Sequence, residues 1–322
     1  MGWSNLIEGK TILVTGGTGS FGHVAIVNLL KSKPREIRVM ARHEDSLHTM
    51  ARTFPDPRLK FIVGDVRDER RVFEVSEKVD IILHVAALKQ VPDCEVHPFE
   101  AVKTNILGAE NVRRAAIANE VEAVVAISTD KAVKPVNAMG MTKALQEKIM
   151  TSNEMQNHKT RFMVVRYGNV MGSTGSVIPL FLEMLSKNQS LVVTDFKMTR
   201  FLLSLDDALQ LVFTALKHGM GREIFVLKCP ACRIKDLAEV IAAGRVDVVE
   251  GKIRPGEKIH ETLIHEDEMR RSQESSTYYT IFPSDSNTVS LSTQAGEFTS
   301  ENARRLSKEE LKALLKQHGW IK

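Results

Sequence analysis

Short apolar runs alternate with amphipathic stretches along the first half of the chain. The runs are rich in β-branched residues and too short for helices, which is typical of strands buried on both faces of a parallel sheet. They fall at residues 11–14, 37–40, 59–63, 80–84, 121–127 and 161–166. Between them, apolar residues recur at helical spacing over 21–31, 68–78, 99–118 and 138–155. This alternation predicts an α/β fold with a doubly wound parallel sheet.

The second half of the chain has a less regular pattern. It predicts a strand over 224–227, an amphipathic stretch that ends at Leu185, and helices over 205–216, 234–241 and 308–318. Residues 272–300 are rich in Ser, Thr, Asn and Gln. We expect that segment to be either a long surface excursion or an arm that reaches another subunit.

Composition and charge exclude several classes of protein. Hydrophobic residues make up 43% of the 322 positions and charged residues 26%, close to the globular average, which excludes a disordered chain. The 44 Lys and Arg against 40 Asp and Glu give a net charge of +4, too small over this length to favour nucleic acid or a membrane surface. No signal peptide and no apolar run of about 20 residues is visible, so we expect a cytoplasmic protein without a membrane segment.

The three cysteines, Cys94, Cys229 and Cys232, are too few for a disulfide framework. Cys229 and Cys232 have the spacing of metal ligands, but no second pair exists to complete four ligands. We interpret them as small apolar residues at the end of a strand and predict no metal site.

A glycine-rich turn, Thr15-Gly16-Gly17-Thr18-Gly19-Ser20-Phe21-Gly22, follows the first predicted strand. Gly16 would allow the tight turn, Gly19 would let the backbone approach a pyrophosphate, and Gly22 would let the helix pack closely on the strand. The start of the following helix favours an anion. Because the motif follows the first strand of a βαβ series, it predicts a Rossmann-type dinucleotide site. Its candidate residues are Gly16, Thr18, Gly19, Ser20, Phe21 and Gly22.

The residues after the second and third strands bear on the choice of dinucleotide. An NAD site usually has a carboxylate at the end of the second strand, but this chain has Ala41 followed by Arg42. A guanidinium there can hold a 2′-phosphate, so we predict NADP. Glu44 is interpreted as the charge at a helix N-terminus. Asp65, followed by Val66, comes after the third strand, where it either accepts a hydrogen bond from the adenine amino group or is an ordinary loop residue.

Polar residues directly follow the fifth predicted strand, in the run Ile127-Ser128-Thr129-Asp130-Lys131. Ligands bind at the carboxyl ends of such strands, so we expect these side chains to face the cofactor. Further on, Met139 and Lys143 share one face of the predicted helix. A hydroxyl, a tyrosine and a lysine in this arrangement would be the catalytic set of short-chain dehydrogenases, but methionine occupies the tyrosine position here.

These motifs resemble those of extended short-chain dehydrogenases/reductases. They are most similar to the inverting UDP-N-acetylglucosamine 4,6-dehydratases of capsule, O-antigen and flagellin-sugar pathways. The Thr-Asp-Lys triplet is the most specific part, because nucleotide-glucose 4,6-dehydratases have Thr-Asp-Glu there. The similarity covers nearly the whole chain, in the segments TGGTGSFG (15–22), GDVRD (64–68), STDKAVKP (128–135), RYGNVMGSTGSVIP (166–179), KMTRF (197–201), GREIF (221–225), RPGEKIHE (254–261) and FTSEN (298–302).

The resemblance implies a redox-neutral reaction with a recycled cofactor. Hydride leaves sugar C4 for the nicotinamide, water is eliminated across C5 and C6, and hydride returns to C6. By position, Thr129 hydrogen-bonds the C4 hydroxyl, Asp130 is the general acid for the C6 hydroxyl, and Lys131 removes the C5 proton. Lys143 binds the nicotinamide ribose. We expect burial and nearby positive charge to lower the pKa of Lys131 toward neutrality.

Met139 departs from the tyrosine-dependent pattern. A thioether cannot accept the C4 hydroxyl proton, so the base for C4 oxidation is Lys131, Asp130 or a water relayed through Thr129. Some dehydratases of this family carry Met at this position, so the change does not by itself imply an inactive protein.

The resemblance also implies a site for a UDP-sugar, which needs cations for two phosphates and polar groups for uracil and ribose. Arg200 and Arg254 are the predicted phosphate contacts. Glu257 is predicted to bind the ribose, and Lys89 to reach the sugar or its phosphate. The other predicted substrate residues are Asn169, Val177 and Thr194. Ala86 and Asn105 are two further predicted cofactor contacts. For Asn105, the alternative is a buried hydrogen bond between helices.

We therefore predict a UDP-N-acetylglucosamine 4,6-dehydratase that inverts C5 and forms UDP-2-acetamido-2,6-dideoxy-β-L-arabino-hex-4-ulose. The alternatives are a UDP-sugar 4-epimerase, a retaining 4,6-dehydratase and a non-catalytic NADP-sensing protein. The predicted NADP-binding Rossmann domain spans 1–167, with a return segment at about 205–227. Residues 168–204 and 228–322 form the predicted smaller C-terminal α/β substrate-binding region and arm. The resemblance also suggests a homo-oligomer, with a hexamer as one form.

Overall fold

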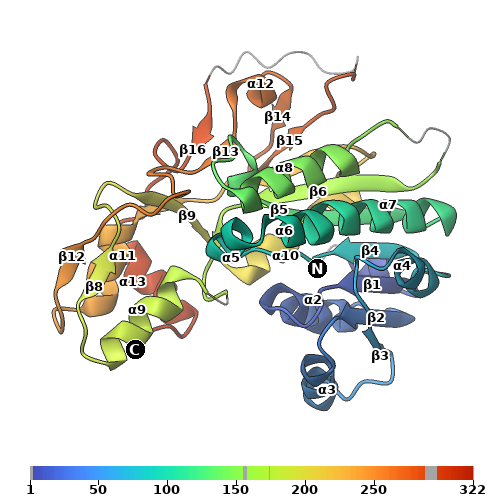
Figure 1. Cartoon of the computed structure of the whole chain (residues 1–322), viewed down its shortest axis with the longest axis horizontal. Coiled ribbons are helices and arrows are strands. Elements are labelled where there is room, and N and C mark those ends of the chain that lie inside the picture. The colour runs from blue at the N-terminus through green and yellow to red at the C-terminus, as the bar shows by residue number, and fades with distance from the viewer. Residues whose placement is uncertain (1–2, 155–157, 174, 287–295, 322) are drawn as a thin grey trace.

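A nine-stranded sheet forms the centre of the described part of the chain (Figure 1). The structure is a computed structural model, and it describes residues 3–154, 158–173, 175–286 and 296–321. The strand order is β14-β15-β10-β6-β5-β4-β1-β2-β3. The strands of this sheet are β1 (Thr11–Thr15), β2 (Glu36–Ala41), β3 (Leu59–Val63), β4 (Ile81–His84), β5 (Ala123–Thr129), β6 (Arg161–Tyr167), β10 (Ile224–Leu227), β14 (Ser272–Glu274) and β15 (Tyr278–Ile281).

Neighbouring strands from β3 to β10 pair in parallel. All of β1 and β4 and most of β5 are buried, because helices cover both faces of the sheet. The predicted doubly wound parallel sheet is therefore confirmed, and each predicted strand is present within one or two residues of its expected bounds.

Helices cover both faces of the sheet, as expected for right-handed crossovers between parallel strands whose order reverses direction after β3. One face carries α2 (Ser20–Lys31), α3 (Glu44–Thr53) and α10 (Leu205–His218), and the other α4 (Glu69–Val75), α7 (Gly108–Ala118) and α8 (Ala138–Met150) (Figure 1). The short helical segments are α1 (Ser4–Ile7), α5 (Val91–Val96), α6 (Pro98–Ala101), the π-helical η1 (Val102–Leu107) and the 3₁₀-helical η2 (Asp130–Ala132).

A smaller C-terminal region has a core of its own, which includes Phe181, Leu191, Leu237 and Leu311. Its small sheets have the orders β11-β9-β7, β12-β8 and β13-β16. The strands are β7 (Asn169–Val170), β8 (Leu191–Val193), β9 (Thr199–Leu203), β11 (Ala231–Arg233), β12 (Val248–Glu250), β13 (Thr262–Ile264) and β16 (Phe298–Thr299). The helices are α9 (Val177–Ser186), α11 (Ile234–Ala242), α12 (Glu266–Met269) and α13 (Lys308–Gln317).

The polar segment 272–300 is neither a free excursion nor an arm over its first ten residues. Strand β15 pairs antiparallel with β10, and β14 pairs antiparallel with β15, so this hairpin extends the main sheet. The sequence pattern did not predict this hairpin, because the polar β14 lacks the apolar run of a buried strand. Residues 287–295, the middle of the same segment, lie outside the described residues.

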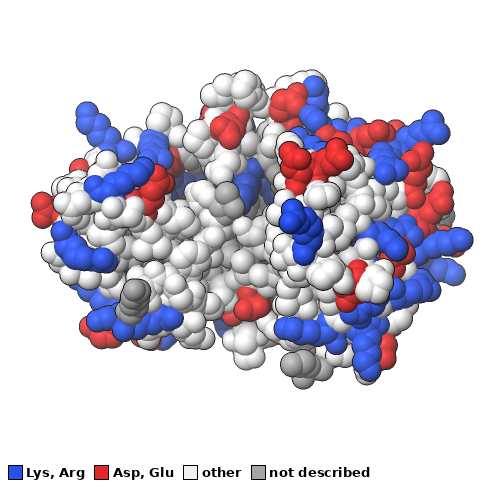
Figure 2. Space-filling view, turned by 90° about the horizontal axis from the view of Figure 1, so that it is seen from below, with Lys and Arg blue, Asp and Glu red and all other residues white. Residues whose placement is uncertain are grey.

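Seen from below, charged side chains gather toward the two ends of the molecule, and the middle is mostly uncharged (Figure 2). Within the described ranges, every helix is too short or too polar to cross a membrane.

Candidate functional site

Most of the predicted cofactor residues lie along the carboxyl ends of the adjacent strands β3, β2, β1 and β4. Asp65 follows β3, Arg42 follows β2, the glycine turn 15–22 follows β1, and Ala86 follows β4. In doubly wound sheets this edge, beside the point where the winding reverses, is where ligands bind. The structure thus brings together residues that lie far apart in the sequence.

The glycines of this turn differ in what surrounds them. Gly16 has a φ of +65°, and a Cβ there would lie 2.7 Å from the Ala86 Cα. A Cβ on Gly22 would lie 1.9 Å from the Gly17 carbonyl oxygen, so α2 packs directly against the turn. At Gly19 the nearest atom to such a Cβ is 3.5 Å away. Packing therefore requires Gly16 and Gly22, whereas the surroundings of Gly19 are open, as a pyrophosphate site needs.

The start of α2 offers backbone donors for an anion. Gly19 is the N-cap residue, and none of the described side chains caps the helix. Thr18 and Ser20 flank it and are partly exposed, whereas Phe21 is buried. Since the first N–H groups of a helix lack partners within the helix, this end fits the pyrophosphate of a dinucleotide.

Arg42 and Asp65 lie close enough for the charge of one to act on the other. Asp65 is bound by Arg67, whose Nε and Nη2 donate to Oδ2 at 2.8 and 2.6 Å. Burial raises the pKa of Asp65, but the bonds to Arg67 and the two guanidinium charges outweigh it and lower the pKa. Val66, the next residue, is buried. Asp65 therefore already has a partner, while Arg42 is exposed and forms no ion pair with the described residues.

Asn105 holds the loop after β4. Its Oδ1 accepts the Leu88 N–H at 2.8 Å, and its Nδ2 donates to the Leu88 carbonyl at 3.0 Å and to Thr142 Oγ1 at 2.9 Å. The side chain is fully buried in η1. These contacts correspond to the predicted alternative, a buried hydrogen bond that joins elements.

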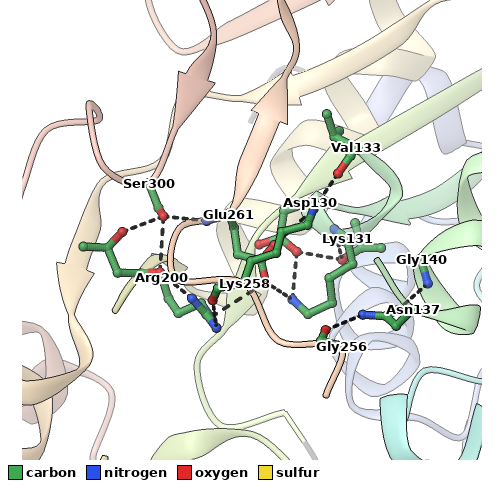
Figure 3. A network of polar contacts seen from close by, with 12 residues as sticks. Asp130, Lys131, Val133, Asn137, Gly140, Arg200, Gly256, Lys258, Glu261 and Ser300 are labelled. Carbon is green, nitrogen blue, oxygen red and sulfur yellow. Dashed lines mark hydrogen bonds and ion pairs between the residues drawn. The ribbon is translucent and has the colours of Figure 1, made fainter. Parts of the chain in front are cut away.

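The triplet Thr129-Asp130-Lys131 lies where β5 ends and η2 begins (Figure 3). Thr129 Oγ1 donates to Asp130 Oδ1 at 3.0 Å, and Lys131 Nζ donates to the same oxygen at 2.9 Å. Asp130 is fully buried, and its Oδ2 has no hydrogen-bond partner among the described residues. Next to this oxygen is the backbone of Gly168, where a Cβ would lie 3.3 Å from Oδ2. The triplet is thus one hydrogen-bonded unit with an unpaired buried oxygen.

Glu261 joins this unit, although no role was predicted for it (Figure 3). Its Oε1 lies 3.4 Å from Lys131 Nζ and 3.8 Å from Arg200 Nε, and its Oε2 lies 3.8 Å from Lys258 Nζ. Ser300 fixes its backbone: the Glu261 N–H donates to Ser300 Oγ at 2.9 Å, and the Ser300 N–H donates to the Glu261 carbonyl at 2.8 Å. Its place at the end of the RPGEKIHE segment is the one signal that could have identified it from the sequence.

The charges around Lys131 determine the protonation of its neighbours. Burial lowers the pKa of Lys131, but Asp130 and Glu261 outweigh it and raise the pKa. Burial raises the pKa of Asp130, and the negative charge of Glu261 adds to the rise against the opposing charge of Lys131. Burial also raises the pKa of Glu261, yet Lys131, Arg200 and Lys258 outweigh it and lower the pKa. The expected near-neutral pKa of Lys131 is therefore wrong, because two acidic side chains flank the amine.

Lys143 lies on α8 beside the end of β5. Its Nζ donates to the Ile127 carbonyl at 2.5 Å and to Gln146 Oε1 at 2.7 Å. Burial lowers the pKa of Lys143 to about 8, although Glu147 opposes this. Burial, helped by the charge of Lys143, lowers the pKa of His84 to about 3, so the imidazole at the end of β4 is neutral.

Met139 is buried in a small apolar cluster with Cys94 and Ala101. Its thioether packs there and has no proton to exchange. Lys143, four residues later on the same helix face, is therefore an ionisable group without the tyrosine that usually accompanies it.

Cys94, Cys229 and Cys232 are all buried free thiols. Burial raises the pKa of Cys229 and that of Cys232 to about 12, so neither thiol is ionised near neutral pH. The residues that the structure describes contain no group of His, Cys, Asp and Glu side chains that could hold a metal ion.

Arg200, one of the predicted phosphate contacts, is bound by backbone carbonyls. Its Nη1 donates to the carbonyls of Thr199 and Ile259 at 2.7 and 3.1 Å, and its Nη2 to that of Lys258 at 2.9 Å. These bonds tie β9 to the segment 254–261. Part of the guanidinium is consequently committed to holding that segment.

The remaining predicted substrate residues come from separate elements of the C-terminal region. Asn169 lies in β7, and its Oδ1 is buried with no hydrogen-bond partner in the described chain. Val177 is the first residue of α9, and Thr194 follows β8.

Arg254, Glu257 and Lys89 lie on loops. Arg254 is exposed, and its backbone N–H donates to Glu257 Oε2 at 3.4 Å. Lys89 is exposed in the loop after β4. No hydrogen bond among the described residues joins these three side chains to Asp130 or Lys131, so only Arg200 of the predicted phosphate contacts reaches the catalytic unit.

The chain is similar to known proteins over most of its length. The family model described as "Polysaccharide biosynthesis protein" matches residues 12–283. A Rickettsia bellii (strain OSU 85-389) protein named "UDP-glucose 4-epimerase" is 43% identical, with 95% of each chain covered. The X-ray structure of Pen from Bacillus thuringiensis has a TM-score of 0.90 at 38% identity, and covers 97% of this chain and 99% of that one. DesIV, a dTDP-glucose 4,6-dehydratase from Streptomyces venezuelae, shares the fold, with a TM-score of 0.70 at 22% identity over 77% of this chain and 86% of that one.

Proposed function

Because the chain belongs to the polysaccharide biosynthesis protein family of extended short-chain dehydrogenases/reductases, which modify nucleotide sugars, we propose that it is a UDP-N-acetylglucosamine 4,6-dehydratase. The proposed product is the C5-inverted 6-deoxy-4-keto sugar. The observation that carries the proposal is the 2.9 Å contact between Asp130 and Lys131 at the carboxyl edge of the sheet. Elimination of water needs an acid and a base side by side, and this pair offers both.

Asp130 is the proposed acid for the C6 hydroxyl. Its burial and its raised pKa support a protonated carboxyl group, which can give a proton to a departing hydroxyl. Thr129, which bonds to the same carboxyl group, is the proposed partner of the C4 hydroxyl.

Lys131 is the proposed base for the C5 proton, and it acts only as a neutral amine. The acidic neighbours of Lys131, of which Glu261 keeps its charge, raise its pKa, so Lys131 must release its proton before this step. Its side chain is 23% exposed, so solvent can accept that proton. A keto group at C4 acidifies the C5 proton, and the amine therefore need not be a strong base.

The residues at the sheet edge fit a dinucleotide, and the proposed cofactor is NADP. When bound, it supplies the hydride acceptor for C4 and the hydride donor for C6. The N–H groups at the start of α2 would hold its pyrophosphate, Lys143 its nicotinamide ribose and Arg42 its 2′-phosphate. An arginine in place of a carboxylate after β2 supports NADP over NAD.

A UDP-sugar 4-epimerase is the second candidate, favoured by the name of the Rickettsia bellii relative. Such an enzyme removes hydride from C4 and returns it there, so it needs no acid and base at C5 and C6. Both reactions begin with removal of the C4 hydroxyl proton, which Met139 cannot accept, so Met139 does not separate them. The paired Asp130 and Lys131 therefore support the dehydratase.

Incubation with UDP-N-acetylglucosamine and mass spectrometry of the product tests the proposal. Loss of the mass of one water supports the dehydratase, whereas an unchanged mass with a changed configuration at C4 supports the epimerase. Lys131→Ala should abolish water loss while NADP still binds. Lys134→Ala, which changes an exposed lysine three residues further on, is the matched control. Turnover near that of the wild type in Lys131→Ala would contradict the assignment of the base.

Inversion at C5 has a separate test. A proton that returns to the opposite face of C5 comes from solvent, so a product formed in deuterated water should carry deuterium at C5. The product should also have the L configuration by nuclear magnetic resonance. A product of D configuration at C5 would support the retaining alternative instead.

A further inference from the structure

Two buried carboxylates, Asp130 and Glu261, share one lysine. The Lys131 ammonium lies 2.9 Å from Asp130 Oδ1 and 3.4 Å from Glu261 Oε1 (Figure 3). When two carboxyl groups share a buried site, their environments push their affinities for a proton apart, and one of them holds the proton. Which of the two is protonated decides which can act as an acid.

Glu261 has more positive neighbours than Asp130. Besides Lys131 it faces Arg200, at 3.8 Å, and Lys258, at 3.8 Å. Asp130 has Lys131 as its only cation within ion-pair distance among the described residues. The negative charge is therefore better stabilised on Glu261, and the shifts of the two pKa values, down for Glu261 and up for Asp130, agree with this.

The hydrogen bonds of Asp130 leave room for a proton on one oxygen. Oδ1 accepts from both Thr129 and Lys131, so it is occupied as an acceptor. Oδ2 is buried and accepts nothing from the described residues. Glu261 Oε2 also lacks a hydrogen-bond partner among these residues, but it lies 3.8 Å from the Lys258 ammonium. An ionised Asp130 carboxylate would leave Oδ2 charged and unpaired in the interior, which is costly, whereas a hydroxyl there would be neutral.

We propose that Glu261 is a positioning residue that keeps Asp130 protonated, and so makes Asp130 the general acid of the site. The inference deepens the proposed function and rests on it for the reaction that Asp130 serves. Glu261 provides the fixed negative charge for the three cations, and Asp130 is thereby released from acting as their counter-ion. The charged and titratable groups that face the two carboxyl groups are Lys131 on η2, Arg200 on β9, Lys258 on the segment 254–261, and Cys229.

Glu261→Gln separates this role from others because it removes the charge and keeps the shape. Asp130 then becomes the only carboxylate beside Lys131 and should ionise near neutral pH. The first readout is infrared absorption by the C=O bond of a protonated carboxyl group, taken as a difference against Asp130→Asn. The wild type should show this band near neutral pH, and Glu261→Gln should lack it. This measurement needs no substrate, so it judges the inference even if the protein does not dehydrate UDP-N-acetylglucosamine.

The second readout is the pH profile of kcat for dehydration. Loss of the Asp130 proton ends activity on the alkaline side, so this limb should move to lower pH by about one unit or more in Glu261→Gln, with about a tenfold loss or more at pH 8. Activity should recover on acidification. A UDP-N-acetylglucosamine with fluorine in place of the C6 hydroxyl should rescue the variant, because fluoride leaves with little help from an acid.

Two matched variants accompany the test. Glu261→Asp keeps the charge and should keep the infrared band and most of the pH profile. Glu266→Gln removes an exposed carboxylate that pairs with Arg270 on α12, and both readouts should stay as in the wild type.

Three results would overturn the inference. The first is a wild type without the infrared band. The second is a Glu261→Gln profile that is lower but parallel to that of the wild type, without rescue by the fluorinated substrate, as a merely structural role would produce. The third is a Glu261→Gln variant whose kcat is higher than that of the wild type at neutral pH, or recovers at alkaline pH. Either outcome would mean that Glu261 acts on the base Lys131 instead.

Discussion

Arg166 and Glu147 form a two-pronged ion pair in the interior of the protein. Arg166 Nε lies 2.9 Å from Glu147 Oε1, and Nη2 lies 2.5 Å from Oε2. Glu268 binds the same guanidinium through Nη1 and Nη2 at 2.8 and 2.9 Å. Since Glu147 is on α8, Arg166 on β6 and Glu268 on α12, this cluster joins the helix that carries Lys143 to the C-terminal region.

Arg166→Met should therefore destabilise the protein strongly. It would leave two buried carboxylates without their cation, and breaking a buried pair in this way costs about 3–5 kcal/mol. Urea unfolding at a fixed protein concentration measures the loss. Arg70→Met is the control, because Arg70 is 90% exposed and its pair with Glu74 contributes about 0.5 kcal/mol or less. Equal losses in the two variants would show that the buried cluster does not stabilise the fold.

Two glycine variants should separate packing from cofactor binding. Gly22→Ala would put a Cβ 1.9 Å from the Gly17 carbonyl oxygen, so the thermal unfolding temperature should fall. Gly19→Ala has 3.5 Å to the nearest atom and should keep its unfolding temperature but bind the dinucleotide more weakly. Fluorescence titration with NADPH measures the binding. Unchanged affinity in Gly19→Ala would argue against a pyrophosphate at this turn.

Arg42→Ala tests the choice of cofactor. If the Arg42 guanidinium binds the 2′-phosphate, the variant should lose about tenfold or more in affinity for NADP, and much less for NAD, which lacks that phosphate. Isothermal titration with both dinucleotides gives the two affinities, and Arg70→Ala is an exposed control. Equal losses for both dinucleotides would remove Arg42 from the 2′-phosphate site.

Lys143 should make stability depend on pH in the alkaline range. Burial lowers its pKa from 10.5 to about 8. Between these two values the unfolded chain binds a proton that the folded protein has lost, so the free energy of unfolding should rise with pH. The full contribution is at most about 3 kcal/mol. Lys143→Met should lack this contribution. The free energy of unfolding of the wild type should therefore increase relative to that of the variant as the pH rises through this window. A constant difference between the two would contradict the lowered pKa.

Exposed apolar side chains on one surface favour a homo-oligomer. They lie on the packed segments α5, α6, η1 and α8, and patches of this kind often mark contacts with other chains. The residues are Val96, Phe99, Leu107, Met141 and Leu145. Light scattering should give a multimer for the wild type and a smaller mass for Met141→Glu with Leu145→Glu. Val192→Glu, on β8, is the control. A monomeric wild type at micromolar concentration would contradict the prediction.

Local signals in the sequence predicted the parts of the fold and the site that depend on neighbouring residues. The run 11–14 is apolar throughout because helices cover both faces of the strand, and this pattern predicts a buried strand. The spacing of Gly16, Gly19 and Gly22 follows from one turn between a strand and a helix. Thr129, Asp130 and Lys131 are adjacent in the chain. Their contact therefore needed only the end of β5 to be placed correctly.

Interactions between distant segments were not predictable in the same way. Glu261 meets Lys131 across 130 positions of sequence, and the sign of the pKa shift of Lys131 depends on that meeting. Arg200 is predicted to contact a phosphate through its guanidinium, and the sequence does not show that carbonyls of the segment 254–261 also bind this group. A residue type indicates which groups a side chain can bind, but only the fold shows which groups of the protein already contact it.

The hairpin of β14 and β15 also determines how this sheet ends. Without it, β10 would present a row of unpaired N–H and C=O groups to solvent, and such an open edge is a template for strands of other molecules. With it, the outermost strand is β14, only Ser272–Glu274 long, with Gln273 and Glu274 exposed. A chain that lacked only residues 272–281 would retain the glycine turn, Asp130, Lys131 and Glu261, together with β16 and α13. It should nonetheless aggregate, because its sheet would have lost the strands that protect it from its own copies.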